Sequence, residues 1–136
     1  MDPVKLWQLM LSLLLLAPPV CAKDLGQWKK NDPVIRQWYR DLMRPDNPTV
    51  SCCGEADAYW CDDVRVRNGR TYCRITDTRP NELLGRRPVD VGTELYIPDR
   101  AIKWDEGNPT GHVIVFLVHG LGGFKAVVCF VQVTGA

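Results

Sequence analysis

The dipeptide Asn68-Gly69 is the strongest single constraint on the fold of this chain. It is the residue pair preferred in a two-residue type I′ turn, whose backbone matches the twist of paired strands. The flanking segments, 59–67 and 70–77, largely alternate polar and apolar residues. This pattern predicts a β-hairpin over residues 59–77.

A two-residue turn determines which residues oppose each other and so divides the hairpin into two faces. The face predicted to pack on the core carries Trp60, Val64, Val66, Cys73 and Ile75. The face predicted to be solvated carries Asp63, Arg65, Arg67, Arg70, Tyr72 and Arg74. The four arginines, Arg65, Arg67, Arg70 and Arg74, form a candidate anion-facing surface. The alternative is a solvated face on which Asp63 balances part of their charge.

The same register bears on two cysteines in the hairpin. Cys61 would oppose Thr76 and point to the polar face, whereas Cys73 would point to the core. A disulfide requires Cα atoms within about 7 Å and side chains directed at each other. We therefore expect Cys61 and Cys73 not to bridge unless a bulge interrupts the strand, and Cys73 to be a small buried apolar residue.

A helix is predicted over residues 33–43. Asp32 is a favourable N-cap, Pro33 is tolerated at the first helical position, and Pro45 ends the segment. Four apolar residues follow at helical spacing and form a stripe suited to core packing: Ile35, Trp38, Tyr39 and Leu42.

The C-terminal part of the chain predicts central strands. Two nearly continuous apolar runs rich in valine, 112–118 and 124–133, flank a glycine-rich turn, so we expect a hairpin over residues 112–133 covered on both faces. Shorter strands are expected near 94–97 and 101–104. The predicted fold class is α+β, with an N-terminal helix packed on a small antiparallel β-sheet or a partly open β-barrel of five to six strands.

Residues 1–22 are typical of a cleavable secretory signal. An apolar segment over residues 6–17 is ended by two prolines, and Val20 and Ala22 are small residues that fit cleavage after Ala22. The apolar segment is shorter than the roughly 20 residues of a spanning helix, so no stable membrane span is expected after cleavage. The alternative is an uncleaved N-terminal anchor. We expect one exported domain over residues 23–136, periplasmic or extracellular.

The small net charge of the chain argues against nucleic acid as a partner. The net charge of the chain is +1 and stays +1 without residues 1–22, because Lys5 and Asp2 leave together. This balance argues against a strong electrostatic grip on nucleic acid.

Cleavage after Ala22 would remove Cys21 and leave five of the six cysteines, so at least one thiol would be unpaired within the chain. The candidates for a structural disulfide are Cys52, Cys53 and Cys129, with one of the adjacent pair bridged to Cys129. Such a bridge would tie a turn-rich loop to the last strand.

Two alternatives for the Cys52-Cys53 loop involve chemistry. Cys52, Cys53, Asp57 and His112 suit zinc or copper by ligand type, although no CxxC or HxxxH spacing supports a metal site. A redox or nucleophilic thiol would need a nearby base, and His112 and His119 are the histidines of the chain. At strand ends, histidines are more often surface or capping residues.

Several segments together resemble an uncharacterised family of small exported bacterial proteins with a Cys-Cys-Gly-Glu-Ala-Asp motif. The segments are 45–48, 51–60, 103–104, 108–111 and 129–131. The resemblance implies location and shape, and one bridge plus one spare thiol among Cys52, Cys53 and Cys129; Cys61 and Cys73 depart from the family pattern. We expect a non-enzymatic exported domain with an envelope protein as candidate partner and no cofactor, the alternative being a metal-binding or thiol-redox protein.

Overall fold

The computed structural model describes residues 2–4, 21, 28, 30–104, 107–123 and 125–133. The predicted signal segment, residues 1–22, therefore lies almost wholly outside the described residues. Within the described ranges, no helix combines the length and the apolar character needed to cross a bilayer.

The main helix, α2, spans Pro33–Asp41. The Asp32 side chain caps it by accepting a hydrogen bond from the Val34 N–H at 2.7 Å. Leu42 is already extended, and its carbonyl accepts a hydrogen bond from the Cys52 N–H. The helix thus ends two residues earlier than predicted. The predicted fold class placed this helix at the N-terminus. That part of the prediction is wrong, because the helix begins at residue 33.

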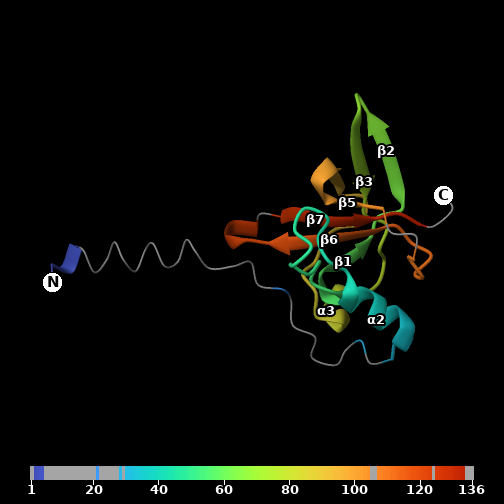
Figure 1. The fold of residues 1–136 in the computed structure, drawn as a ribbon, viewed down its shortest axis with the longest axis horizontal. Coiled ribbons are helices and arrows are strands. Elements are labelled where there is room, and N and C mark those ends of the chain that lie inside the picture. The colour runs from blue at the N-terminus through green and yellow to red at the C-terminus, as the bar shows by residue number, and fades with distance from the viewer. Residues whose placement is uncertain are drawn as a thin grey trace.

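Two small sheets form the β part of the fold (Figure 1). The four-stranded sheet has the order β1-β6-β7-β5, with β1 Ala58–Trp60, β6 Ile114–His119, β7 Lys125–Val131 and β5 Ile102–Lys103. The three-stranded sheet has the order β2-β3-β4, with β2 Asp63–Arg67, β3 Arg70–Arg74 and β4 Glu94–Ile97. The connections contain α3 Asn81–Leu84 and the 3₁₀ turns η1 Glu55–Asp57, η2 Asp99–Ala101 and η3 Leu121–Gly123.

The α+β class is therefore present, but its arrangement differs from the prediction. The described residues form seven strands in two sheets rather than one sheet or barrel of five to six strands. The sheets are also not wholly antiparallel, because β5 pairs with β7 in parallel.

The two central strands are covered on both faces, as their continuous apolar runs predicted. Alternate residues of β6 point to opposite sides: Ile114 and Phe116 pack with α2, whereas Val115 and Leu117 pack with the three-stranded sheet. Tyr39 of α2 meets the edge of the Phe116 ring at a centroid distance of 6.0 Å. In Figure 1, α2 and the β2–β3 hairpin lie on opposite sides of the β6–β7 pair.

The predicted hairpin over residues 59–77 divides between the two sheets. The Asn68-Gly69 turn and its register are confirmed, since Val64 pairs with Cys73 and Arg67 pairs with Arg70. Residues 58–60, however, leave this ladder and pair with β6 as β1. Sequence periodicity could not distinguish one long strand from two short strands that belong to different sheets.

This division makes the expectation for Cys61 and Cys73 wrong. The β2–β3 ladder ends at Asp63, and the Cys61 N–H bonds instead to the Val113 carbonyl at 2.9 Å. Cys61 thereby leaves the hairpin register, turns into the core and forms a disulfide with Cys73 across 5.7 Å between Cα atoms. Both cysteines are almost fully buried.

The expectation that the valine face of the hairpin packs on the core is also wrong at the hairpin's outer half. Cys73 and Ile75 are buried, but Val64 is 36% exposed and Val66 is 69% exposed. Val64 lies on the edge strand β2, opposite the buried Cys73. The hairpin projects beyond the other described elements, so its tip packs against none of them (Figure 1).

A second disulfide joins Cys52 to Cys129 in the layer between α2 and the four-stranded sheet. Its Cα atoms are 5.8 Å apart, and both residues are fully buried. The bond ties the loop after α2 to β7, a central strand. The structure therefore has one disulfide in each apolar layer.

These two buried disulfides should differ in their contribution to stability. The Cys52–Cys129 bond closes a loop of 77 residues and the Cys61–Cys73 bond a loop of 12 residues. On loop-closure entropy, Cys52→Ala with Cys129→Ala should lower the free energy of unfolding by about 4.5 kcal/mol, and Cys61→Ala with Cys73→Ala by about 3 kcal/mol. Urea unfolding followed by tryptophan fluorescence measures both. Equal losses, or a larger loss for the shorter loop, would contradict this order.

Candidate functional site

The adjacent cysteines Cys52 and Cys53 point in opposite directions. Cys52 enters the core, whereas Cys53 is half-buried and forms a disulfide with Cys21, with 5.1 Å between Cα atoms. Cys53 has φ of 82°, a left-handed conformation that residues with a side chain rarely adopt. The Ser51 hydroxyl supports this turn by accepting a hydrogen bond from the Cys53 N–H at 2.9 Å. The strained residue thus separates a core disulfide from a surface disulfide.

All six cysteines lie in the described residues, and all six are paired. In the uncleaved chain Cys21 is bonded to Cys53. The expectation of a spare thiol concerns the chain cleaved after Ala22 and stays a prediction. The cleavage itself, which would remove Cys21, is likewise a prediction. Three disulfides indicate an oxidising, extracellular-type environment.

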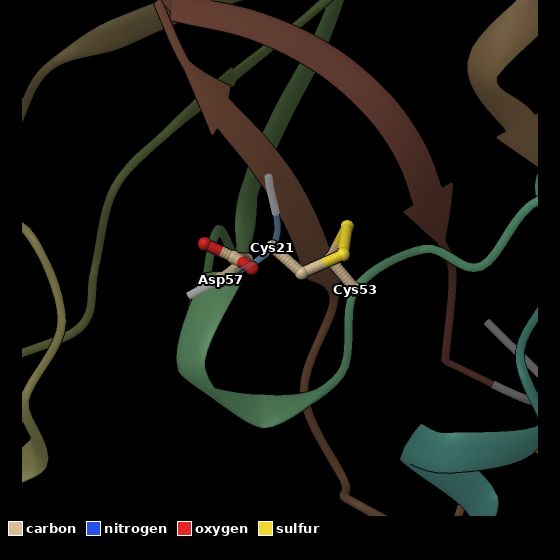
Figure 2. Close-up of side chains that lie close together, drawn as sticks. All are labelled: Cys21, Cys53 and Asp57. Atoms are coloured by element: carbon tan, nitrogen blue, oxygen red, sulfur yellow. A yellow bond between two sulfur atoms is a disulfide. The ribbon is translucent and has the colours of Figure 1, made fainter. Parts of the chain in front are cut away.

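The Cys21–Cys53 disulfide borders a cavity of about 280 Å³ between α2 and η1. Figure 2 shows the Asp57 carboxylate beside the bond, and its oxygen and the two sulfur atoms lie within 4.8 Å of one another. Trp28 lines the same cavity and is 2% exposed, and its indole N–H has no hydrogen-bond partner among the described residues. Arg36 and Glu55, which form an ion pair at 3.9 Å, line it as well.

The arrangement of Cys21, Cys53 and Asp57 would allow two kinds of chemistry, thiol–disulfide exchange and metal binding. Cys21 is exposed, so an incoming thiolate can attack the Cys21–Cys53 bond, whereas the two core disulfides are shielded. If the bond is reduced, its two sulfurs and the Asp57 carboxylate become three ligands of types that zinc accepts.

The structure does not gather the four predicted metal ligands, Cys52, Cys53, Asp57 and His112. Cys52 is bonded to Cys129 in the core. His112 lies at another cluster, where its Nδ1 contacts the Asp62 carboxylate at 2.9 Å. Only Cys53 and Asp57 remain together, and among the described residues their third neighbour is Cys21.

The cluster around His112 was missed by sequence reasoning. The imidazole stacks on the Trp60 ring with centroids 3.8 Å apart and planes 9° from parallel. Asp62 also accepts hydrogen bonds from the Val113 N–H and the Thr76 hydroxyl. Fifty positions separate Asp62 from His112, so no local pattern could have joined them. With its carboxylate bound to backbone and hydroxyl donors, this cluster fastens the start of β6 to the end of β1.

A buried ion network behind Trp60 was also missed. The side chains of Asp77 and Arg86 are both fully buried and form an ion pair at 2.6 Å. Arg79 reaches the same carboxylate at 2.8 Å. Arg86 additionally bonds to the Ala58 carbonyl of β1 at 3.0 Å, which links it to the four-stranded sheet.

Aromatic rings accommodate the extra positive charge of this network. The Arg79 guanidinium lies 4.1 Å from the Trp60 ring centroid, and that of Arg86 lies 4.6 Å from the Tyr59 centroid. Burial raises the pKa of Tyr59 to about 12, against the lowering effect of Arg86. The Tyr59 hydroxyl donates a hydrogen bond to the Arg87 carbonyl at 2.5 Å. Tyr59 therefore has a structural role, because it ties β1 to the loop after α3.

The four arginines of the candidate anion-facing surface lie on one exposed face of the three-stranded sheet. Arg65 pairs with Asp63, and Arg67 and Arg74 share Glu94. Arg70 lies 6.0 Å from the Tyr96 ring centroid and, in the described part of the chain, has no carboxylate partner. A shallow hollow at the tip is lined by Arg67, Asn68, Arg70 and Tyr72.

The chain matches no protein-family model, no curated protein and no solved structure.

The buried Asp77 carboxylate should control stability. Burial alone would raise its pKa, but hydrogen bonds from Arg79, Arg86 and the Trp60 N–H hold the pKa well below its ordinary range. Asp77→Asn would leave the Arg86 charge buried without its counter-charge and should cost about 3–5 kcal/mol in urea unfolding at pH 7. Asp99→Asn, at an exposed position, is the matched control.

The pH dependence gives a second test of Asp77. A carboxyl with a depressed pKa in the folded state stabilises fully above its unfolded-state pKa, near 4, and this contribution is lost as the pH falls towards the folded-state value. The difference in unfolding free energy between the wild type and Asp77→Asn should therefore shrink below about pH 4. A difference that stays constant down to pH 2 would contradict the assignment.

Proposed function

We propose that this chain is an exported, disulfide-stabilised domain that works by binding a protein partner in the bacterial envelope or outside the cell, without catalysing a reaction. The two buried disulfides, Cys52–Cys129 and Cys61–Cys73, carry the proposal, because both remain whether or not the chain is cleaved after Ala22. Such pairing is typical of small domains in oxidising compartments, where disulfides supplement a modest core. The N-terminal segment supports export by its signal-like pattern.

The distribution of polar groups supports binding rather than catalysis. The buried charges Asp77 and Arg86 satisfy each other inside the framework, and the Asp62–His112 pair is held between two strands and a tryptophan ring. The projecting hairpin, by contrast, presents apolar and cationic side chains to solvent, which is the composition of a contact surface. A protein partner would use this surface.

The state of Cys53 after export provides the test. If export is followed by cleavage after Ala22, the mature chain of residues 23–136 should retain the Cys52–Cys129 and Cys61–Cys73 bonds and expose the Cys53 thiol. Intact mass spectrometry after alkylation should show one modified cysteine without reduction and five after reduction. A chain cut before Cys21 should show no modified cysteine without reduction and six modified cysteines after reduction.

Cys53→Ser is the matched control. Cleaved after Ala22, it should show no modified cysteine without reduction and four after reduction. Protein that stays in the cytoplasm of a bacterial host with all its thiols reduced would overturn the proposed function.

A thiol-redox function is the second candidate, favoured by the position of the Cys21–Cys53 bond at a cavity. In this reaction the thiolate of a partner dithiol attacks one of the two sulfurs and releases the other as a thiolate. The partner's second thiolate then attacks the mixed disulfide. The partner dithiol is thereby oxidised to a disulfide, and Cys21 and Cys53 are both reduced.

Redox buffers separate the two candidates. In the uncleaved chain, equilibration with reduced and oxidised glutathione followed by alkylation measures each pair by mass. A redox function requires the Cys21–Cys53 bond to be reduced at a glutathione potential at which the Cys52–Cys129 bond stays oxidised. Exposed disulfides have higher reduction potentials than buried structural ones. Simultaneous opening of both pairs would reject it.

A further inference from the structure

We propose that the outer edge of β2, together with the arginine face of its hairpin, binds an extended acidic segment of a partner protein as an added strand. The sheet β2-β3-β4 would thereby gain a fourth strand next to β2. This inference rests on the proposed binding function and names the chemistry of the partner. It draws on three features: a free backbone edge, exposed apolar side chains and excess positive charge.

The free edge belongs to β2, which is the outermost strand of its sheet. Among the described residues, β2 pairs with β3 alone. In an antiparallel ladder, hydrogen-bonded and non-hydrogen-bonded pairs alternate. The pair that flanks a two-residue turn, here Arg67 and Arg70, is hydrogen-bonded. Val64 and Val66 therefore direct their N–H and C=O groups outward, where a partner strand can pair with them.

The exposed apolar side chains lie on the same two residues. Val66 is 69% exposed and Val64 is 36% exposed, and both lie on the edge strand of the hairpin that projects in Figure 1. An edge strand with exposed branched apolar residues is prone to pair with another chain. A partner strand with an apolar residue opposite each valine would remove these side chains from water.

The other face of the hairpin supplies the charge preference. It carries four arginines, which meet two carboxylates, Asp63 on the hairpin and Glu94 on the neighbouring β4. Glu94 is shared by Arg67 and Arg74, so it cannot satisfy both guanidinium groups fully. Carboxylates on an added strand next to β2 would lie on the same face as Arg65, which belongs to β2 itself. Arg67 and Arg70 lean the other way, toward Glu94 and Tyr96 of β4, and add positive charge to this face. Charge complementarity therefore favours an acidic partner.

A peptide strand uses this surface better than other anions do. Nucleic acid or an anionic membrane would engage the arginines but would leave the outward N–H and C=O groups of Val64 and Val66 unused. The net charge of +1 also gives little long-range attraction to a polyanion. An alternating strand of acidic and apolar residues uses the backbone edge, the valines and the arginines together.

The probe for the test is a capped, fluorescein-labelled decapeptide of alternating glutamate and valine, and fluorescence anisotropy reports its binding to the purified, oxidised protein. A version of the peptide with N-methyl groups on alternate residues, in both registers, cannot donate hydrogen bonds to the edge. We expect the N-methylated peptides to bind at least about tenfold more weakly. A lysine–valine decapeptide should not bind, and binding of the glutamate peptide should weaken as salt is raised.

Protein variants test the two halves of the surface separately. Val66→Pro removes one outward N–H without removing a donor of the β2–β3 ladder and should weaken binding about tenfold. Arg65→Gln removes the cation of β2 nearest the outer edge on the arginine face and should weaken binding about fivefold. Arg87→Gln, an exposed arginine in the loop after α3, is the matched control and should bind like the wild type. Far-ultraviolet circular dichroism and the disulfide count verify that each variant is folded.

Three outcomes would overturn the inference. The first is that the glutamate–valine peptide does not bind. The second is that the N-methylated peptides bind equally well, which would show attraction by charge alone. The third is that a DNA duplex or an anionic phosphatidylglycerol vesicle binds more tightly than the peptide. Because the assay uses oxidised protein regardless of how it was exported, its failure would leave the proposed export and disulfide pairing intact.

Discussion

A single buried carboxylate, Asp77, links the segment after β3 to β1, where the two sheets of this protein meet. It accepts a hydrogen bond from the Trp60 N–H of β1 at 3.1 Å, and it pairs with Arg86, which in turn bonds to the Ala58 carbonyl. Asp77 itself lies just beyond β3, so this one side chain joins the strands of both sheets where they diverge. Since a buried charge without a partner costs several kcal/mol, the network stabilises only when all its members are present.

The two core disulfides complement the Asp77 network because they lie in the apolar layers rather than in the polar junction. Cys52–Cys129 is in the apolar layer under α2, and Cys61–Cys73 is in the layer between the sheets. Each bond restricts the unfolded chain, whereas the Asp77 network specifies the folded arrangement. A domain anchored in this way tolerates a hairpin that projects from it without covering its valines. The exposed tip is thus a feature that the framework can carry, and a binding surface is the role that we propose for it.

Local signals predicted the elements of the fold, and contacts distant in sequence determined how the elements combine. Asn68-Gly69 predicted the turn and the Val64–Cys73 pairing, and the apolar runs predicted β6 and β7 as covered central strands. The departure of residues 58–60 from the hairpin depends on β6, more than 50 positions later, and no pattern within residues 59–77 contains that information. The error about Cys61 and Cys73 followed directly, because it assumed an unbroken ladder. The Asp62–His112 pair was beyond prediction for the same reason, since fifty positions separate its members. The Asp77–Arg86 pair spans nine positions, but it lies in a segment without hydrophobic periodicity, so no pattern indicated that both residues are buried.

The opposite orientations of Cys52 and Cys53 explain how the same loop can serve both structure and surface chemistry. Cys52 packs in the core layer with Tyr39 and Phe116, and its bond to Cys129 does not depend on Cys53. The left-handed conformation of Cys53 sends its sulfur outward, to Cys21 and the cavity. The surface bond can therefore open, or lose Cys21 in the cleavage that we propose after Ala22, without breaking the core bond between Cys52 and Cys129. The redox state of Cys53 would then report how the chain has been processed without altering the framework that presents the hairpin.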